Sequence, residues 1–318
     1  MKKKIILFIM LFISLVSITA CGSKKNNKEE NKKEIATPLL YEVTKEGSNN
    51  KIYILGTIHV GELSNIEFAD YVKKSFADSH YVAAEVDNED NENDIFEEFN
   101  KMMYQDDDNI KNHLTEEQYS KLMKFIDDND LDMGFFDKDK MNLNYYSSLI
   151  IQFISEKSGL NMEEGIDNYF VNRAKKEGKI FMEIESSDFQ DSLLLNLSNA
   201  YYVNSIISAI DNIDEEIEGV KQMFGSWKKG DEEELWKDDG SIFKEEDRSK
   251  YSEEDIKAAQ EFDEKVLYSR NLTMTDKLEE FFNNNYDTFF MVGQDHVVGN
   301  KGIVSHLRQR GYKVERLK

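Results

Sequence analysis

The chain has 318 residues, of which 40% are hydrophobic and 12% aromatic, so it can bury a substantial core and is not a disordered protein. It carries 63 acidic and 40 basic residues, a net charge of −23, and such a surface repels phosphate backbones, which argues against nucleic acid as a partner. Its single cysteine, Cys21, excludes a disulfide within the chain.

Residues 1–20 have the pattern of a bacterial lipoprotein signal peptide. Lysines precede an apolar run from Ile5 to Val16, and the stretch ITAC, Ile18–Cys21, is typical of a lipobox. We therefore expect cleavage before Cys21 and attachment of fatty acyl chains such as palmitate to this cysteine. The expected location is the extracytoplasmic face of the cell membrane, with the membrane as a partner. An uncleaved membrane anchor is the alternative.

The next residues separate this signal from a single folded domain. Residues 21–36 are polar and lysine-rich, which predicts a flexible tether, and residues 37–318 are expected to form one domain that starts near Pro38. Two apolar segments, 39–44 and 51–55, flank a turn rich in Gly and Asn, which predicts an opening β-hairpin.

Apolar residues from Ile66 to Phe76 recur at helical spacing, and the following segment, HYVAAEVD, predicts a short strand that ends at Glu85. The chain then turns acidic, and about 87–160 is expected to be a mostly helical insertion. One helix of this insertion should begin after Thr115, because Thr115 and Gln118 have the spacing of a capping box.

The second half of the domain repeats the strand-and-helix pattern. IFMEIE predicts a strand that ends at Glu185, and about 190–285 is expected to be a second helical insertion. The segment 287–293, DTFFMVG, predicts a strand, followed by a helix and a last strand in YKVERL. The fold class expected is therefore α/β: a central mixed, largely parallel β-sheet flanked by helices, with an acidic, mostly helical insertion.

Two Gly-x-x-His motifs follow apolar strands directly. Gly56 precedes His59 in the first motif, and Gly293 precedes His296 in the second. A glycine at a strand end allows the backbone to turn sharply, so a histidine three residues later can lie over the edge of the sheet. Hydrogen bonding of both histidines to the backbone of a turn is the alternative.

Glu85 and Glu185 also end strands. If these strands are parallel in one sheet, both glutamates and both motif histidines gather at its carboxyl edge, where open α/β folds bind ligands. Imidazole and carboxylate groups suit Mn²⁺, Co²⁺ or Zn²⁺, and a metal-bound water would serve hydrolysis. The H-E-x-x-H helix of common zinc proteases is absent from the sequence, and we expect His80, His113 and His306 to be structural or solvated.

An ordered set of sequence blocks resembles the TraB/GumN family, which includes Tiki-type membrane-tethered metalloproteases and a peptide-pheromone shutdown protein. The blocks are YILGTIHVG, AAEVD, GIDNYF, GKIFMEIESSDFQ, RNLTM and FFMVGQDHVVGNKGIVSHLRQRGYKVE, which include Gly165, Asp167, Gly178, Lys179, Gln190 and Met274. The resemblance extends from LLYEV to GYKVERL, nearly all of the exported part. The GQDH segment departs from many members, which carry a small residue before Gly or Ala and His.

The resemblance implies an α/β core with a helical insertion, and dependence on a divalent metal in the protease branch. It favours His59, Glu85, Glu185 and His296 as site residues, and it adds Arg270 and Asn271 as helix residues that face the site.

These observations lead us to expect a lipid-anchored extracytoplasmic metal-dependent peptidase that acts on short or membrane-proximal peptides. His59 and His296 would bind the metal. Either Glu85 or Glu185 would complete the metal shell, and the other would be the general base. Of the two, we name Glu185 as the expected metal ligand. Arg270 would polarise a carbonyl or pair with a substrate carboxylate. A non-catalytic lipoprotein that sequesters a peptide pheromone is the alternative, and haem or metal carriage is a third reading.

Overall fold

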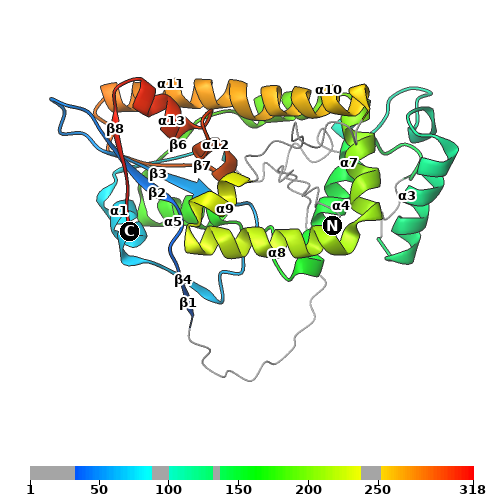
Figure 1. Cartoon of the computed structure of the whole chain (residues 1–318), viewed down its shortest axis with the longest axis horizontal. Helices are drawn as coiled ribbons and strands as arrows, with labels where there is room; N and C mark the ends of the chain where they lie inside the picture. The colour runs from blue at the N-terminus through cyan, green and yellow to red at the C-terminus, as the bar shows by residue number, and fades with distance from the viewer. Residues whose placement is uncertain (1–32, 88–99, 132–136, 238–251) are drawn as a thin grey trace.

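The computed structural model of the chain describes residues 33–87, 100–131, 137–237 and 252–318 (Figure 1). The expected signal peptide, Cys21 and most of the expected tether lie outside the described residues. Within the described part, none of the helices combines the length and the apolar character needed to cross a membrane.

A six-stranded sheet forms the centre of the fold, in the order β6-β5-β7-β3-β2-β8. Its strands are β2 (Leu40–Thr44), β3 (Ile52–Thr57), β5 (Tyr81–Ala84), β6 (Ile180–Glu183), β7 (Thr288–Gly293) and β8 (Lys313–Arg316). The pairs β6-β5, β5-β7 and β7-β3 are parallel, whereas β2 is antiparallel to both β3 and β8. The predicted mixed, largely parallel α/β sheet flanked by helices is confirmed.

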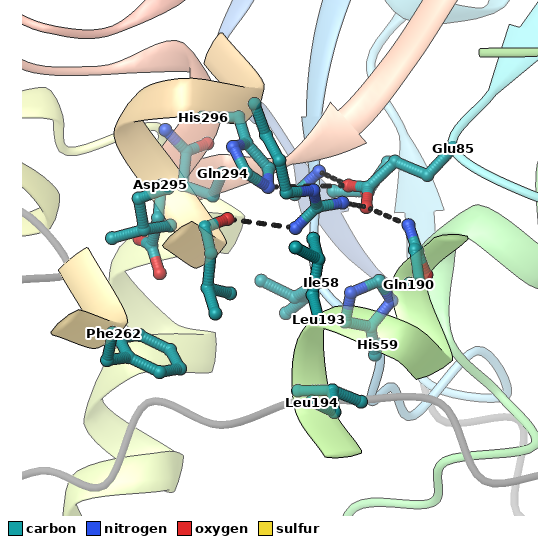
Figure 2. Close-up of a pocket in the computed structure, with 15 residues that line it drawn as sticks. Ile58, His59, Glu85, Gln190, Leu193, Leu194, Phe262, Gln294, Asp295 and His296 are labelled. Carbon is teal, nitrogen blue, oxygen red and sulfur yellow. Dashed lines mark hydrogen bonds and ion pairs between the residues drawn. The ribbon is translucent and has the colours of Figure 1, made fainter. Parts of the chain in front are cut away.

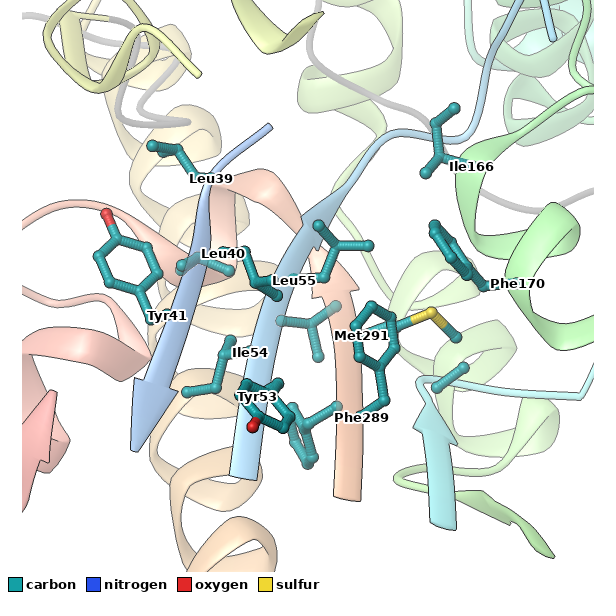
Figure 3. Packing of buried hydrophobic residues seen from close by; sticks show 14 of the residues in the cluster. Leu39, Leu40, Tyr41, Tyr53, Ile54, Leu55, Ile166, Phe170, Phe289 and Met291 are labelled. Atoms are coloured by element: carbon teal, nitrogen blue, oxygen red, sulfur yellow. The ribbon is translucent and has the colours of Figure 1, made fainter. Parts of the chain in front are cut away.

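The central strands β3 and β7 are apolar because helices cover both of their faces. Successive side chains of a strand point to opposite faces. The ring of Phe289 therefore packs 5.3 Å from that of Phe170 in α5 (Ile166–Glu177), while the ring of Phe290 lies 6.2 Å from that of Phe281 in α11 (Ser269–Asn283). Figure 3 shows Leu55, Phe289 and Met291 in this core beside Ile166 and Phe170. Helix α1 (Asp70–Asp78) lies on the α5 side, and α13 (Ile303–Gln309) packs against α11.

The helical insertions build a second apolar core. Its main helices are α3 (Glu116–Asp128), α4 (Leu143–Ser158), α7 (Asn199–Asp211) and α10 (Glu253–Phe262), with the short helices η1 (Ile110–Asn112) and α6 (Ser187–Leu195). The predicted capping box of Thr115 and Gln118 is present. Helix α8 (Ile213–Lys229) contacts both cores, and α9 (Glu232–Lys237) follows it. The parts of the insertions at 88–99, 132–136 and 238–251 lie outside the described residues.

Two local predictions are wrong. Ile66 and Phe68 belong to strand β4 (Ile66–Phe68), and the helix begins only at Asp70. The alternation of buried Ile66, exposed Glu67 and buried Phe68 is a strand pattern, which the helical spacing of the later residues concealed. In addition, the end of the expected tether forms strand β1 (Glu34–Ala36), which pairs in parallel with β4.

Candidate functional site

A pocket lies at the carboxyl ends of the parallel strands (Figure 2). Its polar side chains are those of Thr57, His59, Glu85, Gln190, Arg270, Gln294, Asp295 and His296. Its apolar wall consists of Ile58, Leu193, Leu194, Phe262, Val266 and Leu267. The pocket therefore joins a charged floor to an apolar wall, at the edge of the sheet where α/β folds bind ligands.

The strand register brings the two Gly-x-x-His motifs together. Thr57 of β3 pairs with Gly293 of β7, so the two strands end side by side. His59 then lies in a loop, whereas His296 lies in the four-residue helix α12 (Gln294–Val297). Both histidines line the pocket, which is the convergence predicted from the sequence.

Arg270 links the two predicted glutamates. Its Nη2 lies 2.6 Å from Glu85 Oε2 and 2.7 Å from Glu185 Oε2, and its Nε lies 3.0 Å from Glu185 Oε1. Gln190 Nε2 donates to both carboxylates, at 3.0 Å to Glu85 and 2.9 Å to Glu185. The Arg270 Nη1 group donates to the carbonyl of Val266, in the π-helical turn η3 (Asp263–Tyr268) that precedes α11. The guanidinium group is thus fixed between two carboxylates in a buried site.

The charges of this cluster stabilise one another. Burial by itself would raise the pKa of Glu85, but Arg270, the two histidines where they are protonated, and the backbone N–H of Gly293, 2.7 Å from Oε1, outweigh burial and hold the pKa well below its usual range. Burial likewise opposes the charge of Arg270, and the two glutamates outweigh it, so the pKa of Arg270 is raised. Glu85 and Arg270 are therefore an ion pair in the folded chain.

His296 is held as a neutral ring. Its Nδ1 lies 2.6 Å from Asn271 Oδ1, and Asn271 Nδ2 donates to the carbonyl of Lys301, which fixes the orientation of the amide. Nδ1 therefore carries the proton and Nε2 the lone pair, 4.0 Å from Glu85 Oε1. Burial and then the charge of Arg270 lower the pKa of His296 to about 3.

His59 has the opposite electrostatic setting. Its Nδ1 lies 3.1 Å from Asp167 Oδ2, so Nδ1 donates and, in the neutral ring, Nε2 carries the lone pair. Burial opposes the charged form of the ring, but Asp167 and then Glu85 outweigh burial, and the pKa of His59 is raised above its usual value.

The two motif glycines have different steric roles. A Cβ on Gly56 would overlap the side-chain amide of Gln294, so an alanine in the first motif would require this buried side chain of the second motif to move. A Cβ on Gly293 would lie 3.4 Å from Glu85 Oε1, which is ordinary contact. Gly293 contributes mainly its backbone N–H, which holds Glu85.

All six predicted site residues thus gather in this cluster: His59, Glu85, Glu185, Arg270, Asn271 and His296. Their catalytic and metal-binding roles stay predictions. Asp167 and Gln190 also contact the cluster, and the sequence alone predicts no role for them, although both stand in the family-like blocks. Their positions in those blocks were the signal that could have identified them.

Within the described residues, no three His, Cys, Asp or Glu side chains are close enough together to form a ready metal-binding group. The donor chemistry nevertheless suits a divalent ion, because oxygen acceptors hold the Nδ1 atoms of both histidines. The charge suits it as well. With neutral imidazoles, the carboxylates of Glu85, Glu185, Asp167 and Asp295 and the guanidinium of Arg270 give a formal net charge of −3.

The fold and the site define an α/β protein with a polar, histidine-containing pocket at the carboxyl edge of its sheet. The sequence profile of the TraB/PrgY/gumN family matches residues 39–316, so the chain belongs to this family. No curated protein and no solved structure matches the chain.

Proposed function

We propose that this protein is a lipid-anchored extracytoplasmic peptidase that depends on a divalent metal, Mn²⁺, Co²⁺ or Zn²⁺. The observation that carries the proposal is the matched orientation of His59 and His296, each of which donates from Nδ1 to an oxygen and keeps its lone pair on Nε2. Metal-binding histidines are usually oriented in this way. The net negative charge around the pocket, formally −3 with Asp295 included, adds support, because a divalent cation offsets most of it.

The geometry favours Glu85 over Glu185 as the carboxylate beside the histidines. Glu85 Oε1 lies 4.0 Å from His296 Nε2, whereas both oxygens of Glu185 contact Arg270. The depressed pKa of Glu85 also makes it a poor proton acceptor. We therefore assign Glu85, which lines the pocket, to the metal shell, and this reverses the ligand choice made from the sequence.

The other residues of the pocket prepare it for a peptide. A bound metal would supply an acidified water and polarise the scissile carbonyl. Arg270 and the Gly293 N–H keep Glu85 ionised, and Phe262 and Leu194 belong to the apolar wall beside the charged floor. The same wall accommodates apolar side chains of a substrate.

The test is a cleavage assay on the purified chain after chelation and reloading with Mn²⁺, Co²⁺ or Zn²⁺. We expect metal-dependent fragments of a peptide library in mass spectrometry, and loss of these fragments in His59→Ala and His296→Ala. His80→Ala, which changes an exposed histidine, is the matched control and should cleave as the wild type does. Cleavage that persists in a chelator would contradict the proposal.

A non-catalytic peptide-binding lipoprotein is the second candidate. The internal pairing of Glu85 and Glu185 with Arg270 and Gln190 favours it, because a pocket with satisfied carboxylates can bind a peptide without further chemistry. Retention of intact peptides by the wild type, with or without chelator, would support this function, sequestration of a pheromone included.

The lipid anchor has its own test. We expect the chain to incorporate a palmitate analogue and to fractionate with membranes, and Cys21→Ser to lose both properties. Equal membrane association of Cys21→Ser would favour an uncleaved anchor in residues 1–20 instead.

A further inference from the structure

The loop that carries His59 is paired with the segment that leads into α5. Gly61 and Asn161 exchange two backbone hydrogen bonds of 2.9 Å, and the N–H of Ile166 donates to the carbonyl of Ile58, also at 2.9 Å. Residues 58–63 and 161–167 therefore form one unit, which we call the clasp. The clasp determines where the first turn of α5 lies relative to His59.

Asp167, in that first turn, is buried with a relative exposure of 6%. Its Oδ2 accepts the hydrogen bond from His59 Nδ1, and its Oδ1 is buried with no hydrogen-bond partner among the described residues. The helix N-terminus favours a negative charge at this position. A buried carboxylate with an unsatisfied oxygen costs stability, so a purely structural role would not explain it.

The close approach of Asp167 and His59 depends on Gly165. A Cβ at this position would lie 2.9 Å from Asp167 Oδ1 and 3.0 Å from the carbonyl oxygen of His59. Contacts this short with backbone atoms require the clasp to shift. The glycine therefore allows the carboxylate and the histidine loop to meet.

We propose that Asp167 is the positioning residue of His59: it fixes the tautomer with the proton on Nδ1 and makes Nε2 the stronger of the two imidazole donors. The second part rests on the proposed function, in which Nε2 is a metal ligand. A carboxylate behind a histidine increases the basicity of its ligating nitrogen. His296 has a neutral amide, Asn271, in the equivalent place. The Nδ1 atom of His59 thus donates to a charged carboxylate, whereas the Nδ1 atom of His296 donates to a neutral amide.

The test compares Asp167→Asn with the wild type by ¹H–¹⁵N correlation of the imidazole nitrogens, in the full metal-free chain at alkaline pH. We expect His59 to be in the Nδ1–H tautomer in the wild type. In Asp167→Asn we expect the Nε2–H tautomer to appear, because an amide can turn its Nδ2 donor towards Nδ1. An unchanged tautomer in the variant, or an Nε2–H tautomer in the wild type, would overturn the inference.

Asp108→Asn is the matched control, because Asp108 Oδ2 holds His113 through Nε2 at 2.9 Å outside the pocket. It should alter the signals of His113 and leave those of His59 unchanged. Gly165→Ala keeps the carboxylate but separates the pair, and should also mix the His59 tautomers. Gly225→Ala is its control, since a Cβ at Gly225 meets nothing within 4 Å.

A second measurement links the inference to the metal. Competition with a chromophoric chelator should show Zn²⁺ bound about 10–100-fold more weakly by Asp167→Asn than by the wild type, and equally by Asp108→Asn. Equal Zn²⁺ affinity of Asp167→Asn and the wild type would overturn the ligand-strength part. If the wild type bound none of Zn²⁺, Mn²⁺ and Co²⁺, the proposed function would be overturned, while the tautomer result would still decide the role of Asp167.

Discussion

The two Gly-x-x-His motifs have the same spacing and end neighbouring parallel strands, yet they produce different histidines. The loop histidine, His59, is held by the carboxylate of Asp167, and its pKa is raised. The helical histidine, His296, is held by the amide of Asn271 and lies near Arg270, and its pKa is lowered to about 3. The motif thus determines where a histidine lies, and residues from distant helices determine its protonation.

Arg270 causes part of this difference, because its charge is second only to burial in lowering the pKa of His296, whereas for His59 it comes last, behind burial, Asp167 and Glu85. Arg270→Gln leaves two buried carboxylates without their cation. We expect a loss of about 3–5 kcal/mol in the free energy of unfolding, the range found when one partner of a buried pair is removed. Urea denaturation of the variant and the wild type measures this loss in the free energy of unfolding.

Arg310→Gln is the matched control for Arg270→Gln. Arg310 also pairs with two carboxylates, Asp276 and Glu279, but at the surface, where ion pairs contribute about 0–1 kcal/mol. Similar losses in the two variants would contradict the view that the Arg270 cluster is a coupled, buried unit.

The opposite pKa shifts predict opposite pH dependences. Between about pH 6.5 and 3 the unfolded chain protonates His296 more readily than the folded chain does, so this histidine removes stability as the solution is acidified. The pKa of His59 is higher in the folded chain than in the unfolded chain, so protonation of this histidine stabilises the fold. This stabilisation is complete below the pKa of His59 in the unfolded chain, and it is lost as the pH rises through its pKa in the folded chain.

Urea denaturation of the chelator-treated chain as a function of pH separates the two contributions. Relative to the wild type, His296→Gln should lose less stability on acidification, by up to about 1.4 kcal/mol per pH unit, and His59→Gln should lose less as pH rises above neutral. His80→Gln should follow the wild type throughout. Stability curves for the two pocket variants that run parallel to the wild type would show that the histidines do not differ in this way.

The sequence predicted the sheet and the meeting of the motifs, because both depend on local patterns. The apolar runs of β3 and β7 require burial on two faces, and neighbouring parallel strands deliver their C-terminal loops to one edge of the sheet. Even so, the apolar spacing of Ile66 with Tyr71, Val72 and Phe76 predicts one helix, whereas Ile66–Phe68 form strand β4.

A single sequence does not predict which residues hydrogen-bond to the two histidines. His59 and Asp167 are 108 positions apart, and their contact depends on how the clasp seats the first turn of α5. The choice between Glu85 and Glu185 depends on which oxygens Arg270 takes, and that is set by the rotation of α11 rather than by any spacing.

The glycines of the two motifs offer a smaller test of the same comparison. A Cβ at Gly56 would overlap the buried amide of Gln294, so Gly56→Ala should cost about 1–3 kcal/mol, the usual cost of overpacking. The double variant with Gln294→Ala should recover part of the loss, because the clash is removed. If Gly56→Ala is as stable as the wild type in urea, the packing of Gln294 against the first motif does not require glycine at position 56.

Gly293→Ala should have the smallest effect, below about 1 kcal/mol. The new Cβ would meet Glu85 Oε1 at 3.4 Å, and the backbone angle φ of −48° at this residue is accessible to alanine. The N–H that holds Glu85 also remains. Gly293→Ala should therefore unfold close to the wild-type urea midpoint and keep the His296 pKa near its wild-type value in an NMR titration. A loss as large as that of Gly56→Ala would mean that the two glycines have the same steric role, and that the difference between the motifs lies only in the partners of their histidines.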